Sequence, residues 1–146
     1  TLLEEVLGGI SGVEGVHCCG NTDWSVILQT SLDILSFDAY NYGETLSLYP
    51  SEVKAFLSRG GVIAWGIVPN DEPSLANETE ASLIERLGET MRLLSKKGLS
   101  YDTLQSQCLI TPSCGLGSIS TEAAAMALEM TARVSAGFRE RHYGRN

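Results

Sequence analysis

The sequence has little positive charge and no long apolar run. Lys and Arg number 10 against 18 Asp and Glu, which gives a formal net charge of −8. Its apolar stretches are far shorter than the roughly 20 residues of a membrane-spanning helix, and no secretory signal is visible. Without a basic patch, the chain is not suited to binding a nucleic acid or an anionic membrane. We therefore expect neither among its partners.

Cysteine is also scarce. The chain has four, at positions 18, 19, 108 and 114, which are too few and too irregular for the disulfide framework of a small secreted domain. The adjacent Cys18 and Cys19 would not normally pair with each other. A reducing cytoplasm is therefore the expected location. Apolar residues make up 43% of the chain and charged residues 19%, as in a globular domain.

Apolar stretches alternate with helical patterns along the chain. The predicted strands cover residues 13–19, 32–38, 61–68 and 107–111. The predicted helices cover residues 1–10, 22–30, 50–59, 79–97 and 121–143, with a helical turn at 101–107 and a polar loop at 69–78. Strands that alternate with helices form parallel sheets with right-handed crossovers. The predicted fold class is therefore α/β, with four βα units that correspond to half of an eight-stranded barrel or to a small open sheet.

Side chains suited to metal binding follow the predicted strands. The first strand ends in His17, Cys18 and Cys19. The second ends in Asp38, and Cys114 follows the fourth. In parallel α/β folds the chemistry lies beyond these carboxyl ends. Because side chains alternate along a strand, His17 and Cys19 share a face that Cys18 does not. One imidazole and two thiolates suit Zn²⁺. The fourth coordination position would be filled by Asp38 or left open for a substrate.

These residues also allow plainer interpretations. Buried cysteines are often inert, small apolar side chains, and we interpret Cys18 and Cys108 in this way. His142, near the end of the last helix, is expected to be solvated. Glu44 lies just past the second strand, in a segment at 40–50 that could line a pocket. From the residues alone, segment 16–24 is consistent both with a metal site and with an ordinary core strand.

Four segments together resemble a known protein family. They are "HCCGNTDW" at 17–24, "LDILSFDAY" at 32–40, "GGVIAWGIVP" at 60–69 and "TPSCGLGS" at 111–118. They resemble the C-terminal barrel half of the cobalamin-independent methionine synthases and of the related uroporphyrinogen-decarboxylase-like methyltransferases. The segment from His17 to Asn21 is close to the His-x-Cys-Gly-Asn pattern of the corrinoid-dependent thiol methyltransferases of that superfamily. The segment from Cys114 to Leu116 looks like the one that carries the last zinc-binding cysteine in methionine synthase.

The resemblance implies a (β/α)8 TIM barrel with methyltransferase activity, of the kind used in methionine biosynthesis. In that family a zinc ion binds the thiol of homocysteine or of a similar substrate, and His17, Cys19 and Cys114 would be its ligands here. The methionine synthases have a glutamate where this chain has Asp38, so the fourth ligand could be Asp38, Glu44 or the substrate alone. Glu44 and Asn21 are candidate substrate-binding residues. The methyl donor would be a methylated folate or a methyl-corrinoid, free or on a corrinoid protein, and the short motif favours the corrinoid.

The family barrel has eight strands, whereas four are predicted here. We therefore expect residues 1–146 to be a single domain and a C-terminal half-barrel from a longer protein. A lone half-barrel exposes two sheet edges, so either another barrel half or a second copy, in a homodimer, would cover it. Two other functions are considered: a decarboxylase-like barrel fragment without metal, and a non-catalytic zinc-binding or structural subunit.

Overall fold

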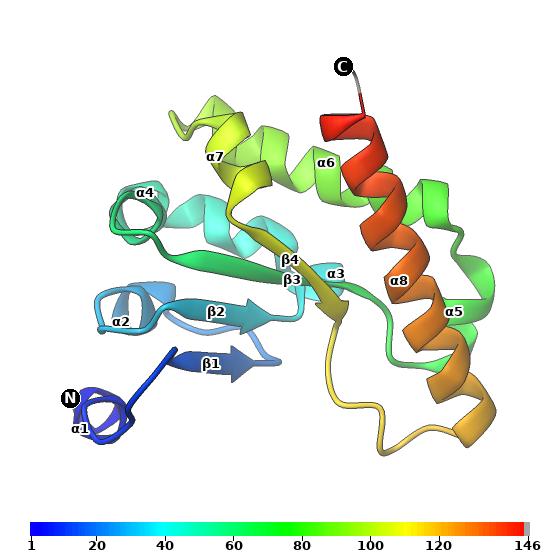
Figure 1. Cartoon of the computed structure of the whole chain (residues 1–146), viewed down its shortest axis with the longest axis horizontal. Helices are drawn as coiled ribbons and strands as arrows, with labels where there is room; N and C mark the ends of the chain where they lie inside the picture. Colours follow the sequence, from blue (N-terminus) through cyan, green and yellow to red (C-terminus); the bar gives the residue numbers. More distant parts are fainter. Residues whose placement is uncertain (145–146) are drawn as a thin grey trace.

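The structure, a computed structural model, describes residues 1–144 (Figure 1). Its strands are β1 (Gly15–Cys18), β2 (Ile34–Phe37), β3 (Val62–Val68) and β4 (Cys108–Pro112). They pair in parallel in the order β1-β2-β3-β4, which is also their order along the chain. The predicted α/β class, with parallel strands alternating with helices, is therefore confirmed.

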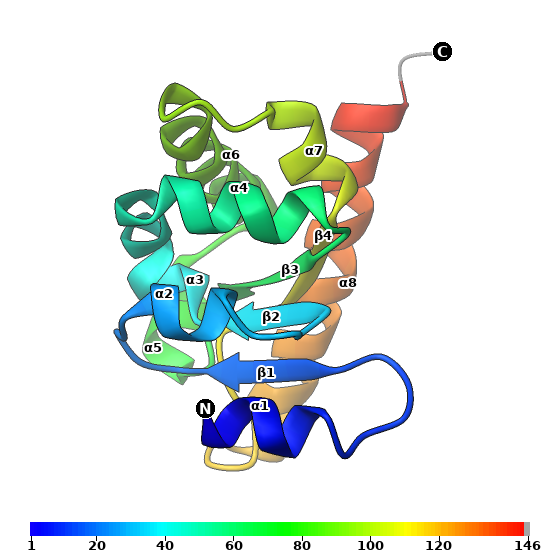
Figure 2. The same ribbon diagram turned by 90° about the vertical axis from the view of Figure 1, so that its left-hand side faces the viewer.

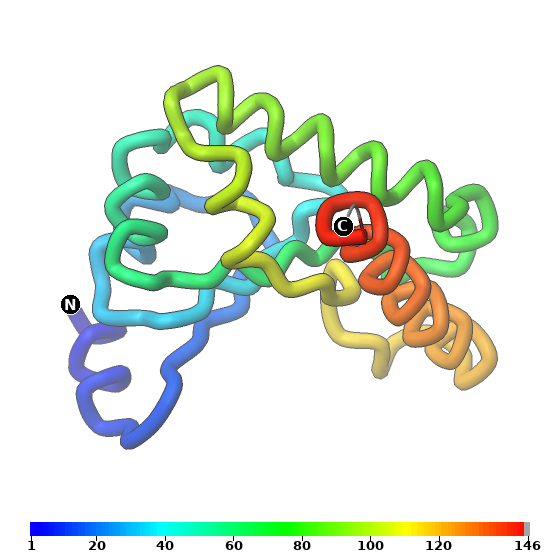
Figure 3. The backbone as a smooth tube through the Cα atoms, turned by 45° about the horizontal axis from the view of Figure 1, so that its top comes forward, coloured from blue at the N-terminus to red at the C-terminus, as the bar shows by residue number. Residues whose placement is uncertain are grey.

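Helices connect the strands on each crossover. They are α1 (Leu2–Leu7), α2 (Trp24–Leu28), α3 (Ala39–Tyr42), the 3-10 helix η1 (Gly43–Leu48), α4 (Pro50–Ser58), α5 (Glu72–Asn77), α6 (Glu80–Lys96), α7 (Tyr101–Ser106) and α8 (Thr121–Tyr143). Figure 2 shows the strands stacked in sequence order with α2 and α4 beside them, and Figure 3 shows the path of α6 and α8, which contact each other.

Short polar side chains start several of these helices. Ser120 caps α8 by accepting a hydrogen bond from the backbone N–H of Ala123. Thr79 and Ser82 form a reciprocal capping box at the start of α6. Asp23 caps α2, so that helix begins at Trp24, two residues later than the predicted start at residue 22. Each cap satisfies backbone donors that the first helical turn leaves unpaired.

Large apolar side chains cover one face of the sheet. Leu35 and Phe37 on β2, and Ile63 and Trp65 on β3, are fully buried against the helices. The ring of Phe37 lies between two tryptophans, with centroids 5.2 Å from Trp24 on α2 and 5.5 Å from Trp65. Burial of such side chains is the main favourable term in folding. This core anchors the strands from which the candidate site projects.

The opposite face of the sheet carries smaller side chains. His17, Ser36, Ala64 and Leu109 lie in register across the four strands. His17 is exposed and Leu109 retains 47% of its accessible surface. In a closed (β/α)8 barrel this is the face that lines the interior. The four units are thus consistent with part of a βα-repeat fold.

The helices of the described chain are not of the membrane-spanning kind. Within residues 1–144, none combines the length and the apolar character needed to cross a bilayer.

Candidate metal centre

Three of the predicted ligands come together at one end of the sheet. His17 belongs to β1, Cys19 follows that strand directly, and Cys114 lies in the loop between β4 and α8. One ligand atom from each lies within 4.8 Å of the other two, and no other such group of His, Cys, Asp or Glu occurs in residues 1–144. His17 and Cys19 are exposed, whereas Cys114 is half-buried. The three residues can therefore hold a metal ion that a molecule in solution can reach.

The loop after β4 brings Cys114 close to His17 and Cys19. β1 and β4 lie at opposite edges of the four-stranded sheet. Figure 1 shows the chain after β4 running down past the carboxyl end of β1 before it enters α8. Cys114 is thus carried to the strand at the far edge.

A hydrogen bond orients the imidazole of His17. Its Nδ1 lies 2.8 Å from the hydroxyl oxygen of Ser36, the residue that pairs with it across β1 and β2. With Nδ1 engaged in this bond, Nε2 is the ring nitrogen left for a metal. Hydrogen bonds of this kind fix the ring and its tautomer in metal sites. The sequence alone predicts no role for Ser36, because its contact with His17 depends on the register of β1 against β2.

The two cysteines of this group influence each other. Interaction with Cys114, first by hydrogen bonding and then by charge, raises the pKa of the Cys19 thiol above its ordinary value. The hydrogen bond stabilises the protonated thiol, and a second negative charge beside the first is unfavourable. A bound cation reverses this balance, because it stabilises both thiolates. The pair is therefore better suited to binding a cation than to standing as two free thiolates.

The other cysteines lie apart from the centre. Cys18 packs against the helix-covered core, and its thiol donates to the carbonyl of Gly20 at 3.5 Å. This agrees with the predicted alternation along β1. Burial raises the pKa of Cys108 to about 12, so that thiol stays protonated and unreactive near neutral pH. Both residues are packing side chains, as the sequence suggested.

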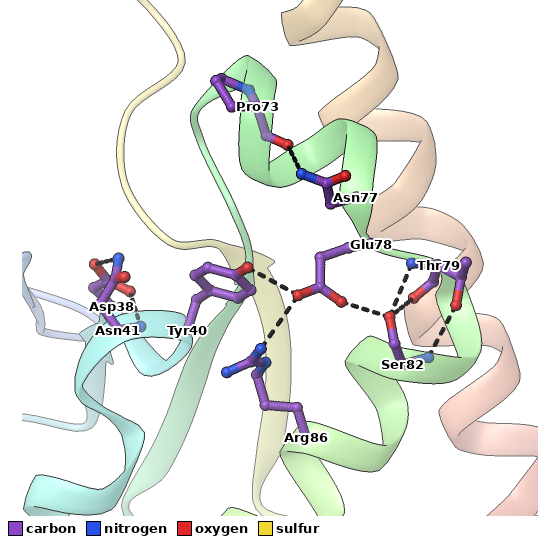
Figure 4. A network of polar contacts seen from close by, with 9 residues as sticks. All are labelled: Asp38, Tyr40, Asn41, Pro73, Asn77, Glu78, Thr79, Ser82 and Arg86. Carbon is purple, nitrogen blue, oxygen red and sulfur yellow. Dashed lines mark hydrogen bonds and ion pairs between the residues drawn. The ribbon is translucent and has the colours of Figure 1, made fainter.

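Asp38 follows β2, where its backbone N–H donates to the carbonyl of Cys18 at 3.4 Å, but it is not one of the three grouped side chains. It is only 5% exposed and caps α3. Its Oδ1 accepts from the backbone N–H of Asn41 at 2.9 Å, and its Oδ2 accepts from the side-chain amide of Asn41 at 2.7 Å (Figure 4). Both carboxylate oxygens are thus already engaged. A role for Asp38 as the fourth ligand stays a prediction.

The two candidate substrate-binding residues also lie outside the group of three. Glu44 is an exposed residue in the first turn of η1 and lines a groove of about 280 Å³ between α3, η1 and α6. Asn21 is an exposed residue in the turn between β1 and α2. Neither is placed by the structure among the metal-binding side chains.

Two residues that line this groove, Tyr40 and Arg86, belong to a network of polar contacts (Figure 4). The hydroxyl of Tyr40 on α3 donates to Glu78 at 2.8 Å, and Arg86 on α6 forms an ion pair with the same carboxylate oxygen at 3.2 Å. The guanidinium of Arg86 also lies 4.5 Å from the centre of the Tyr40 ring. Burial and the neighbouring Glu78 raise the pKa of Tyr40. The network holds α3, which follows Asp38, against α6.

The expected solvent exposure of His142 is not observed. It was predicted to be solvated, but it is half-buried on α8, with its ring 4.4 Å from that of Phe138 and 6.2 Å from that of Tyr101. Its Nδ1 contacts the side-chain amide of Gln105. Burial, with a smaller contribution from Arg141, lowers the pKa of His142. It therefore helps to pack α7 against α8 and lies outside the metal-binding group.

Comparison with known proteins adds no relative. No protein-family model matches the chain, and no curated protein matches it. The three grouped side chains and their surroundings are therefore the features of the chain that bear on its function.

Proposed function

We propose that this chain is the zinc-binding half of a thiol methyltransferase barrel. In this proposal His17, Cys19 and Cys114 hold Zn²⁺, and the site activates a thiol such as homocysteine to accept a methyl group. The observation that supports it most directly is the approach of these three ligand atoms to within 4.8 Å of one another at an accessible edge of the sheet.

The chemistry of the ligands favours zinc over harder metals. Thiolates and imidazoles are its preferred protein ligands, whereas magnesium and calcium prefer oxygen. A structural zinc site is closed by four protein ligands, and a catalytic one keeps an open position. Three ligands, with Asp38 held by Asn41, favour the open arrangement. A cytoplasmic location would keep Cys19 and Cys114 reduced, and all four cysteines are free thiols.

The protein's own residues would prepare the site for a substrate thiol. When bound, zinc lowers the pKa of a coordinated thiol, so that the sulfur reacts as a thiolate. Ser36 holds the His17 ring in place, and the two cysteines provide negative charge that keeps a neighbouring sulfur electron-rich. The substrate sulfur would then form a bond to the methyl carbon as the bond from that carbon to the donor breaks. The donor would be a methyl-corrinoid or a methylated folate.

We also propose that another half-barrel covers the exposed sheet face, from a second copy or from another segment of a longer protein. β1 and β4 lie at the edges of the described sheet, and parallel sheets normally have both faces covered. Several apolar side chains on α1 and just after it are largely exposed: Leu2 at 81%, Val6 at 64% and Val13 at 72%. Light scattering that shows a stable monomer would count against a homodimer.

A non-catalytic zinc-binding subunit is the second candidate. The exposed edges and face of a four-stranded parallel sheet favour it, because such a chain is suited to assembly with a partner. The two functions differ in the fourth metal position. An enzyme would leave it free for a thiol, whereas a structural site would fill it from the protein.

The test is metal analysis of the purified chain and of three cysteine variants. We expect one zinc per chain in the wild type, loss of zinc in Cys19→Ser and Cys114→Ser, and retention in Cys18→Ser, which is the matched control. Cobalt substitution then reports the coordination sphere, and added homocysteine should change the sulfur-to-cobalt charge-transfer band. Zinc binding without that change would favour the structural subunit. A wild-type chain free of metal would favour the decarboxylase-like fragment.

A further inference from the structure

We infer that Asn70, in the turn after β3, is a positioning residue that fixes Cys114 in the metal centre. The inference rests on the proposed function in so far as Cys114 is a metal ligand. Asn70 follows the buried Pro69 and precedes Asp71, the cap of α5. It is therefore anchored between the end of β3 and a helix.

The side-chain amide of Asn70 bridges the residues on either side of Cys114. Its Oδ1 accepts a hydrogen bond from the hydroxyl of Ser113 at 3.0 Å. Its Nδ2 donates to the carbonyl of Gly115 at 3.4 Å. One planar group thus holds the chain immediately before and immediately after the ligand, which limits where the Cys114 sulfur can go.

The residue before Cys114 has no room to move. Ser113 is fully buried, and its backbone N–H donates to the carbonyl of Val68 at 2.7 Å. Gly66 on β3 passes so close that a β-carbon there would lie 2.8 Å from the Cα of Ser113. Ser113 is therefore locked to the end of β3 through both its backbone and its side chain.

The far end of the same loop is held by the first residue of α5. The carboxylate of Glu72 accepts from the hydroxyl of Ser120 at 2.6 Å and from its backbone N–H at 3.3 Å. Between these anchors Leu116 packs against the core, whereas a β-carbon at Gly115 or Gly117 would meet nothing within 4 Å. The position of Cys114 thus depends on a few anchoring contacts, and Asn70 makes two of them, one at each neighbour of Cys114.

Asparagine is well suited to this role. It supplies an acceptor for Ser113 and a donor for Gly115 in one rigid group, whereas aspartate could serve only the first. Alanine would serve neither and would leave the buried Ser113 hydroxyl without this partner. Loss of a group that orients a metal ligand typically weakens metal binding by about 10- to 100-fold.

The test compares Asn70→Ala and Asn70→Asp with Asn77→Ala. Asn77 is a matched control, because its amide donates to Pro73 at 2.9 Å within the same segment. Zinc affinity is measured by competition with a chelator. We expect Asn70→Ala to bind zinc about 10- to 100-fold more weakly, Asn70→Asp to lie between it and the wild type, and the control to be unchanged.

A second readout needs no metal. In the metal-free protein, iodoacetamide alkylates a thiolate with loss of iodide, and mass spectrometry reports the rate at each cysteine. Asn70→Ala should change the rate at Cys114 several-fold and leave that at the buried Cys108 unchanged. If the wild type binds no zinc, the proposed function fails, yet this rate still decides the positioning role.

Three outcomes would overturn the inference. The first is a folded Asn70→Ala variant with unchanged zinc affinity and an unchanged alkylation rate at Cys114. The second is an equal change in the alkylation rates of Cys108 and Cys114. The third is an effect of Asn77→Ala on both measurements equal to that of Asn70→Ala. Should Asn70→Ala not fold, Asn70→Asp carries the test through the same two measurements, because it keeps the bond from Ser113.

Discussion

The hydroxyl of Ser36 lies 2.8 Å from Nδ1 of His17, on the neighbouring strand and in direct register with it. The bond decides which ring nitrogen is available at the centre, and it comes from a residue about half-buried on the less covered face of the sheet. A proposed metal ligand and the group that orients it are thus both set by the pairing of β1 with β2.

Replacing Ser36 with alanine should therefore weaken metal binding without unfolding the chain. Loss of an orienting partner of a ligand histidine typically costs about 10- to 100-fold in affinity. Chelator competition measures the effect. Ser58→Ala is the control, because its hydroxyl bonds only within α4, to the carbonyl of Lys54. Equal zinc affinity in Ser36→Ala and the wild type would show that the bond to Ser36 does not orient His17.

Gly66→Ala should destabilise the fold and disturb the centre. A β-carbon there would lie 2.4 Å from the carbonyl oxygen of Phe37 and 2.8 Å from the Cα of Ser113, so the backbone of β2 or of the Cys114 loop must shift. Overpacking of this kind typically costs about 1–3 kcal/mol, which urea denaturation measures as a lower free energy of unfolding. Gly115→Ala, with no neighbour within 4 Å of the new atom, should show little change. A similar loss in both variants would contradict this explanation.

Tyr40→Phe should loosen the contact between α3 and α6. It removes the hydrogen bond to the Glu78 carboxylate but keeps an aromatic ring beneath Arg86. We expect the free energy of unfolding to fall by about 1.5–3 kcal/mol, the usual scale for a hydrogen bond to a charged group. The control is Tyr143→Phe, at a side chain that is 55% exposed. Equal stability of the two variants would mean that the network in Figure 4 contributes little.

His142 should make the stability of the chain fall in mild acid. Burial lowers its pKa in the folded protein below the ordinary value of 6.5, so the folded state takes up a proton less readily than the unfolded state. Its contribution is therefore fully present above pH 6.5 and is lost as the pH falls through the folded pKa. In thermal melts from pH 7.5 to pH 4.5, His142→Gln should lose less stability than the wild type. Parallel curves would assign the acid sensitivity to other groups.

Much of the fold follows from local patterns in the sequence. The α8 helix lies where the sequence predicts it, and Pro50 opens α4 as its fixed backbone angle favours. The helices α3 and α5 and the 3-10 helix η1 were not predicted, because each is too short to show an apolar period. Segment 69–78, predicted as a loop, contains α5 for this reason.

The sequence by itself determined the class of the fold and the kinds of side chain that make up the candidate metal centre. Alternating strand and helix patterns specify a parallel sheet, and strand periodicity puts His17 and Cys19 on one face with Cys18 on the other. Which residues meet was decided only by the tertiary structure. Strand register pairs Ser36 with His17, and the loop held by Asn70 carries Cys114 across from the opposite edge. Register and loop path depend on packing between segments distant in the chain, and no local pattern encodes them.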